Sequence, residues 1–275
     1  MTKILDKAFG TSYHIDFINN FKNKFIDDYR FVGLAIGGSW IGGNIDEFSD
    51  LDFYLITNPN NKNLSFEDKK LLIEPLGELL NCYENTHDDR VMVCLYKKNS
   101  QLLHVDIKWT DENGFKDRVE NPEILFERET ILSNIMQQYP SSGYPKPDLQ
   151  LHENRFWTWM HYVLSKIGRG ELFEAYHYLC DVRNYCLGPM LLTLHHLPGR
   201  GMRRIELIDK KDLKLLSTGT PKEIADRYLL EATLNTIEHY ILTRNKIINP
   251  EFNPAKKAEV ACLEYAEYIQ KKITK

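Results

Sequence analysis

The sequence predicts an α/β domain followed by an all-α domain, and three observations predict that order. Short apolar runs typical of strands alternate with helical segments in the first part of the chain. From about Pro122 onward, apolar residues recur at helical spacing with almost no strand signal. The stretch YPSSGYPKPD at 139–148 is the most linker-like in the chain. A chain of 275 residues is also long for one domain, so we expect two, over 1–140 and 149–275.

In the first domain, apolar residues at helical spacing between Tyr13 and Tyr29 predict an amphipathic helix. A second helix is expected over Ser65 to Leu80, where a capping box opens the segment and Pro75 kinks or divides it. The apolar runs that predict strands are FVGLAIGG at 31–38, which glycines end, LDFYLIT at 51–57, VMVCLY at 91–96 and LLHVDIKW at 102–109. The last two are close enough in sequence to form a hairpin.

The second domain is predicted to be a helical bundle. Its long helical segments are Glu153 to Ile167, Glu171 to Leu187, Pro221 to Lys246 and Pro254 to Ile273.

Composition excludes several classes of protein. The net charge of −4 argues against broad binding to nucleic acid, which needs a basic surface. The chain has neither a secretory signal nor an apolar run near the roughly 20 residues that span a bilayer, so we expect no membrane partner and a cytoplasmic location. The five cysteines are odd in number and form no C-x-x-C pair, which predicts reduced thiols.

Two aspartates in the stretch AIGGSWIGGNIDEFSDLDFYLI at 35–56 suggest a metal site. Asp50 and Asp52 are two residues apart at the start of a predicted strand, so their side chains should emerge on the same side. Carboxylates held this close repel each other unless a cation lies between them. Magnesium suits such a pair, because it takes one or two carboxylates together with substrate phosphate oxygens.

The turn before this strand and a later strand complete the candidate site. Gly38 and Ser39 end the first strand, where glycine lets the backbone approach a ligand and a hydroxyl donates to phosphate. If a short helix begins at Trp40, its free N–H groups also favour an anion. Asp106 is the candidate third carboxylate, because its side chain alternates with the apolar residues of LLHVDIKW. The alternative for Asp106 is a salt bridge with Lys108 or another neighbour.

These residues together resemble the nucleotidyltransferase superfamily typified by DNA polymerase beta. Gly38-Ser39 precedes Asp50-Leu51-Asp52, and an acidic residue follows on a later strand. A short catalytic domain followed by helices is similar to small bacterial lincosamide and aminoglycoside nucleotidyltransferases. The resemblance implies a mixed sheet flanked by helices. It implies that Ser39 contacts the triphosphate, that Asp50 and Asp52 bind Mg²⁺, and that Asp106 is a metal ligand or the general base.

The function implied is transfer of a nucleoside monophosphate, AMP from ATP in the first instance, to a hydroxyl of a small molecule such as an aminoglycoside or lincosamide. Lys166 and Arg169, at the end of a predicted helix, are candidates to contact the triphosphate, although basic residues also commonly end helices. His195-His196 lacks the acidic or cysteine companions that a metal site needs. A homodimer is plausible. The alternatives are transfer to a tRNA or a protein, and an inactive module that senses nucleotides.

Overall fold

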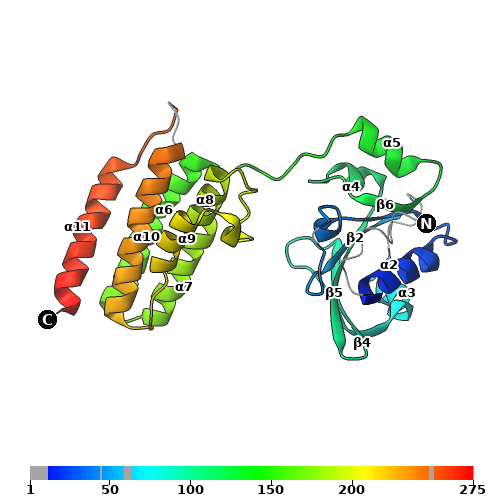
Figure 1. Ribbon diagram of the computed structural model, residues 1–275, viewed down its shortest axis with the longest axis horizontal. Coiled ribbons are helices and arrows are strands. Elements are labelled where there is room, and N and C mark those ends of the chain that lie inside the picture. The colour runs from blue at the N-terminus through cyan, green and yellow to red at the C-terminus, as the bar shows by residue number, and fades with distance from the viewer. Residues whose placement is uncertain (1–11, 44, 59–63, 248–250, 275) are drawn as a thin grey trace. The chain divides into compact units, whose positions relative to one another are not determined.

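The computed structural model describes residues 12–43, 45–58, 64–247 and 251–274. The chain divides into two compact units, Met1–Gly143 and Tyr144–Lys275, each with its own hydrophobic core (Figure 1). Among the helices in these described ranges, none combines the length and the hydropathy needed to cross a membrane.

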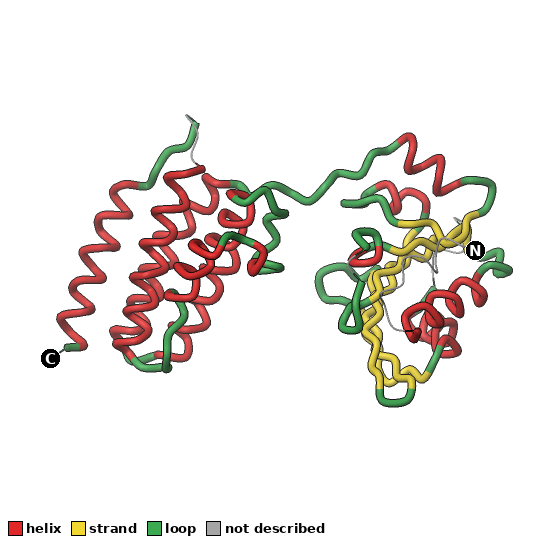
Figure 2. The backbone as a smooth tube through the Cα atoms, in the orientation of Figure 1, coloured by secondary structure: helices red, strands yellow, loops and turns green. Residues whose placement is uncertain are grey.

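A mixed sheet of six strands forms the centre of the first unit, shown in yellow in Figure 2. The spatial order is β3-β4-β5-β2-β1-β6. The strands are β1 (Phe31–Ile36), β2 (Leu51–Thr57), β3 (Glu78–Glu84), β4 (Val91–Lys98), β5 (Gln101–Thr110) and β6 (Glu123–Glu127). The central pair, β2 and β5, is parallel, whereas the other neighbouring strands pair in antiparallel fashion. The predicted hairpin between β4 and β5 is therefore confirmed.

Helix α2 (Ser12–Phe25) covers one face of this sheet with aromatic side chains. Phe17 and Phe21 are fully buried, and the ring of Phe21 lies 4.6 Å from that of Phe53 on β2. Burying such a side chain contributes about 1.5–3 kcal/mol, so this aromatic layer is the main support of the strand that carries Asp52.

The opposite face has a smaller apolar cluster. There, Val32, Ala35 and Ile56 pack against Phe115 of α4 (Glu112–Lys116) and Leu132 of α5 (Ile131–Gln138). These contacts involve β1 and the end of β2. The polar side chains nearer the start of β2 and along the middle of β5 therefore stay half-buried or exposed.

Two edge strands differ from what the sequence predicts. The helix expected to reach Leu80 ends as α3 (Phe66–Ile73), and a 3-10 turn, η3 (Glu74–Leu76), follows it. Pro75 lies in that turn, since it cannot continue the backbone hydrogen bonding of a helix. The residues after it form β3 along β4. Likewise β6 pairs with β1 where a helix was expected after Pro122.

The second unit is helical throughout its described elements, as predicted. The α-helices are α6 (Leu149–Arg169), α7 (Leu172–Val182), α8 (Gly188–Leu194), α9 (Lys210–Thr218), α10 (Asp226–Ile247) and α11 (Lys256–Ile273). A π-helical turn, η4 (Arg183–Leu187), joins α7 to α8, and a 3-10 turn, η5 (Ile205–Leu207), precedes α9.

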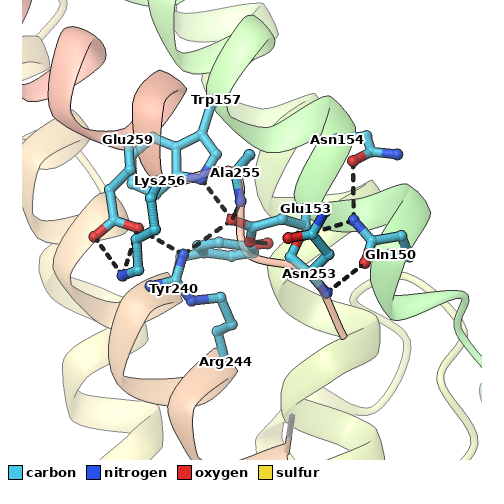
Figure 3. A network of polar contacts seen from close by, with 10 residues as sticks. All are labelled: Gln150, Glu153, Asn154, Trp157, Tyr240, Arg244, Asn253, Ala255, Lys256 and Glu259. Atoms are coloured by element: carbon cyan, nitrogen blue, oxygen red, sulfur yellow. Dashed lines mark hydrogen bonds and ion pairs between the residues drawn. The ribbon is translucent and has the colours of Figure 1, made fainter. Parts of the chain in front are cut away.

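A buried ion pair links three helical segments of this unit (Figure 3). Glu153 of α6 is fully buried, and it accepts a hydrogen bond from Arg244 of α10 at 3.0 Å. Its other donors are Trp157 Nε1 at 2.9 Å, Tyr240 Oη at 2.7 Å and the backbone N–H of Ala255 at 3.0 Å. Arg244 also contacts Glu259 of α11 at 2.9 Å. Both charges are thus compensated without solvent.

Replacing Glu153 by Gln should therefore destabilise the helical unit strongly. Removing one partner of a buried ion pair typically costs about 3–5 kcal/mol. The loss should lie toward the lower value here, because Arg244 keeps its contact with Glu259. Lys256→Ala is the control, since its ion pair with Glu259 is exposed and should contribute at most about 1 kcal/mol. Denaturant unfolding measures both variants. Equal losses in the two would contradict the role given to Glu153.

Candidate functional site

The predicted carboxylates meet at the centre of the sheet. Asp52 on β2 and Asp106 on β5 are direct register partners across the parallel pair. Register partners on neighbouring strands project to the same face, so these two side chains lie side by side. Asp50 lies two residues before Asp52, and its negative charge raises the pKa of Asp106. The structure therefore brings Asp50, Asp52 and Asp106 together.

Asp106 is in a setting that disfavours its charge. Burial raises the pKa of its carboxyl group, and the charge of Asp50 adds to that effect. The hydrogen bond with His104 lowers the pKa of Asp106, since His104 Nε2 lies 2.9 Å from Asp106 Oδ1. A divalent cation would remove the repulsion between these carboxylates. The donor set consists of carboxylate oxygens, which fits a hard cation such as Mg²⁺.

Gly38 lies directly against the carboxylate of Asp52. Its φ is +60°, and a Cβ atom built on it would lie 1.9 Å from Asp52 Oδ2. Only glycine fits at this position, on conformational grounds and for lack of space. The preceding N–H, of Gly37, donates to the carbonyl of Asp52 at 2.8 Å. The turn after β1 is thereby fixed beside the carboxylate of Asp52 on β2.

Ser39 lies in a single 3-10 turn, η1 (Gly38–Trp40), and not at the start of an α-helix. Trp40 closes this turn with a buried ring that joins the core beneath the sheet. The short helix expected from Trp40 therefore begins two residues earlier, and it is too brief to have the dipole of a longer helix. The half-buried Ser39 remains the candidate for contact with phosphate.

Glu120 is a neighbour of the site that the sequence did not suggest. Its Oε1 accepts a hydrogen bond from the N–H of Gly38 at 2.7 Å, across 82 residues of sequence. The sequence predicts that the backbone approaches a ligand at Gly38, and here the Gly38 amide donates to a carboxylate. Glu120 follows α4 in an irregular segment with no strand or helix pattern, so no local signal marks it.

The remaining polar residues of β5 have separate partners. Lys108 pairs with Asp88 at 3.1 Å, so the salt bridge considered for Asp106 forms with a different aspartate. Arg90 binds the same carboxylate at 2.7 Å. These contacts lower the pKa of Asp88, with the Arg90 hydrogen bond as the largest cause. His104 is exposed, and its hydrogen bond to Asp106 makes it part of the site.

Lys166 and Arg169 belong to the helical unit, at the end of α6. Lys166 Nζ forms ion pairs with Glu171 and with Glu174, the latter at 3.1 Å. Arg169 contacts Glu171 at 2.7 Å. Their contact with a triphosphate remains a prediction.

A pocket of about 370 Å³ lies toward the carboxyl ends of β2 and β5. Its lining includes Thr57, Arg90 and Thr110, and none of the predicted site residues. The position of this pocket therefore does not mark the carboxylate cluster of Asp50, Asp52 and Asp106.

The fold and this site together define a two-unit protein whose first unit has an acidic cluster on a mixed sheet. No family model and no curated protein matches the sequence. An aminoglycoside 6-adenyltransferase from Bacillus subtilis is similar in structure over 93% of this chain and 97% of its own, with 15% identity and a TM-score of 0.41. A nucleotidyltransferase-like protein from Exiguobacterium sibiricum is similar over 93% and 74%, with 16% identity and a TM-score of 0.29.

Gly38→Ala should destabilise the turn more than Gly43→Ala. Both glycines have positive φ, which costs an alanine roughly 1–2 kcal/mol, but the Cβ at Gly43 meets nothing within 4 Å. At Gly38 the new methyl must displace either the turn or the Asp52 carboxylate, at a further cost of about 1–3 kcal/mol. Hydrogen exchange over residues 31–57 and thermal unfolding measure the difference. The close packing is refuted if the two variants behave alike.

Asp106→Asn should stabilise the metal-free protein at neutral pH, whereas Asp88→Asn should destabilise it. The raised pKa of Asp106 means that stability is lost as the pH rises through that pKa, and Asn escapes this loss. The lowered pKa of Asp88 means that its contribution is present at neutral pH and is lost on acidification. Thermal unfolding from pH 7 down to about pH 3 measures both variants. The effect of Asp106→Asn should disappear as that carboxyl group becomes protonated, whereas the effect of Asp88→Asn should only begin to decline, because the folded-state pKa of Asp88 lies below this range. A stability loss in Asp106→Asn at pH 7 would contradict the assigned electrostatics.

Proposed function

We propose that this protein is a magnesium-dependent nucleotidyltransferase that transfers AMP from ATP to a hydroxyl of a small molecule. The observation that carries the proposal is the register pairing of Asp52 with Asp106, with Gly38 packed on the Asp52 carboxylate. A sheet that aligns two carboxylates beside a glycine turn offers a cation and a phosphate adjacent positions.

In this proposal Asp50, Asp52 and Asp106 hold Mg²⁺. The ion, when bound, supplies neutralisation of the charge that develops on the phosphoryl oxygens. The Ser39 hydroxyl orients the triphosphate by donating to one of its oxygens. Glu120 limits access to this turn, because a phosphate oxygen can take the Gly38 N–H only after the Glu120 carboxylate has moved.

The Asp106–His104 pair supports a role in proton transfer. A carboxylate held within reach of an attacking hydroxyl can accept its proton, and Asp106 also contacts His104 Nε2 at 2.9 Å. The exposed ring of His104 contacts the same carboxylate and can then pass the proton to solvent. Asp106 serves as ligand, as base, or as both in succession.

The acceptor class rests on the sequence resemblance, which favours an aminoglycoside or a lincosamide. Lys166 and Arg169 are proposed to contact the triphosphate. For Lys166 this requires exchanging the carboxylates of Glu171 and Glu174 for phosphate oxygens, an exchange between anions of the same hydrogen-bonding type.

Asp52→Asn should reduce transfer by more than about 100-fold while the protein stays folded. Even residues that only orient metal ligands cost about 10–100-fold, so loss of a ligand should cost more. The assay combines labelled ATP, Mg²⁺ and a panel of aminoglycosides and lincosamides, and mass spectrometry detects the adenylylated product.

Glu47→Gln is the matched control, since Glu47 is an exposed carboxylate of the loop that precedes β2. It should retain full activity. Turnover of Asp52→Asn near the unmodified level would rule out the metal assignment. Absence of product from the unmodified protein with every antibiotic, but with ATP still bound, would instead favour a macromolecular acceptor or a nucleotide sensor.

A further inference from the structure

A second cluster of polar side chains lies in the helical unit, and the first proposal does not use it. His195 ends α8, while Asp209 and Asp212 lie at the start of α9. His195 Nε2 lies 3.0 Å from Asp212 Oδ2 and 3.8 Å from Asp209 Oδ2. The candidate ligand atoms of these three residues all lie within 4.8 Å of one another. The expectation that His195 lacks acidic companions is therefore wrong, because the loop after α8 returns two aspartates to it.

His239 of α10 adds an independent observation. Its side chain is only 2% exposed, and among the described residues neither ring nitrogen has a hydrogen-bond partner. The Nε2 atom lies 4.0 Å from Asp212 Oδ1, the carboxylate oxygen that faces away from His195. Leaving a buried polar group unpaired costs about 1–3 kcal/mol. This unpaired imidazole directed at a buried carboxylate indicates a missing ligand.

The charge of the cluster also favours a cation. Asp212 is almost fully buried, and Asp209 adds a second negative charge beside it. Lys246 lies near Asp212 Oδ1, but its Nζ is 3.4 Å away and its side chain is 46% exposed. The two carboxylates and the ammonium of Lys246 sum to −1, and the charge of Arg183 also acts on His239.

We propose that His195, Asp209, Asp212 and His239 bind a divalent transition-metal ion, with Zn²⁺ as the best fit. Two imidazole nitrogens and two carboxylate oxygens suit a tetrahedral zinc site and do not suit Mg²⁺. Bonds of about 2.0–2.2 Å place neighbouring ligand atoms of a tetrahedron about 3.3–3.6 Å apart. His195 Nε2 lies 3.0 Å from Asp212 Oδ2 and 3.8 Å from Asp209 Oδ2, close to that range. His239 Nε2 lies 4.0 Å from the other oxygen of Asp212, so the Asp212 carboxylate or the His239 ring must reorient for all four residues to bind one ion.

The ion would be structural, because it has four protein ligands and no open position. Its ligands come from the end of α8, the first turn of α9 and the middle of α10. Binding would therefore join α9 to the α-helices that precede and follow it in the chain, α8 and α10. The site is chemically distinct from the carboxylate cluster of the first unit, so the two cations need not compete.

Zinc binding is tested on the untagged full-length protein after removal of metals with a chelator. Zinc is titrated in competition with a chromophoric chelator, and retained metal is counted by mass spectrometry after desalting. We expect one high-affinity zinc per chain and a higher unfolding temperature with zinc, since a ligand that binds the folded state stabilises it.

Asp209→Asn is the most informative variant. Asp209 caps α9 through the N–H of Asp212 at 2.8 Å, and asparagine caps a helix about as well, so the fold is retained while a charged ligand is lost. Asp148→Asn is the matched control, since Asp148 caps α6 in the same way at 2.9 Å outside the cluster. Asp209→Asn and His239→Gln should weaken zinc binding at least tenfold, and Asp148→Asn should not.

Cobalt(II) supplies a second readout through its visible absorption. A tetrahedral spectrum that Asp209→Asn and His239→Gln diminish, and that Asp52→Asn leaves intact, supports the proposal. The proposal is overturned if the protein retains no zinc, if Asp209→Asn and Asp148→Asn bind it equally, or if intense thiolate bands show cysteine ligation.

Discussion

The alignment of Asp52 with Asp106 across the parallel strands β2 and β5 is the constraint on which the rest of the site depends. Backbone hydrogen bonds of the sheet hold the two strands in register, and an aromatic layer from α2 buries the face beneath them. The backbones that carry the two carboxylates therefore cannot separate without breaking the sheet, and only side-chain rotation can increase the distance between the charges. The neighbouring groups reflect this fixed charge: Gly38 packs on one carboxylate, and His104 binds the other. A rigid frame that holds like charges together is suited to bind a cation without reorganisation.

The helices that pack on this face of the sheet cover only part of it, and this explains why the acidic cluster is accessible. Helices α4 and α5 pack on β1 and on the end of β2, through apolar residues such as Ala35 and Ile56. Their contacts stop short of Asp52, where the same face becomes polar. The helical unit has a different chemistry, because its aspartates are grouped with histidines. Hard oxygen ligands in one unit and mixed nitrogen and oxygen ligands in the other would select different cations.

The sequence predicted the central strands and the long helices, but it failed at both edges of the sheet. The runs that became β1, β2, β4 and β5 are rich in apolar residues because the sheet interior buries them. By contrast, β3 is mostly exposed, so its residues have little of the alternation that marks a strand. Residues of β6 follow a proline and are likewise only partly buried. At such edges, pairing with an existing strand decides the structure, and local propensity contributes little.

The sequence by itself determined which side chains could share a face. Alternation along a strand is a local property, so the placement of Asp50, Asp52 and Asp106 could be inferred from residues a few positions apart. Only the tertiary structure decided which strands are neighbours, and hence that Asp52 lies opposite Asp106. It also brought Glu120 to Gly38 across 82 residues, and Asp212 and His239 to His195 from separate helices. Such contacts depend on how whole helices and strands pack. That packing depends on many apolar contacts between residues far apart in the sequence, so no short sequence pattern predicts it.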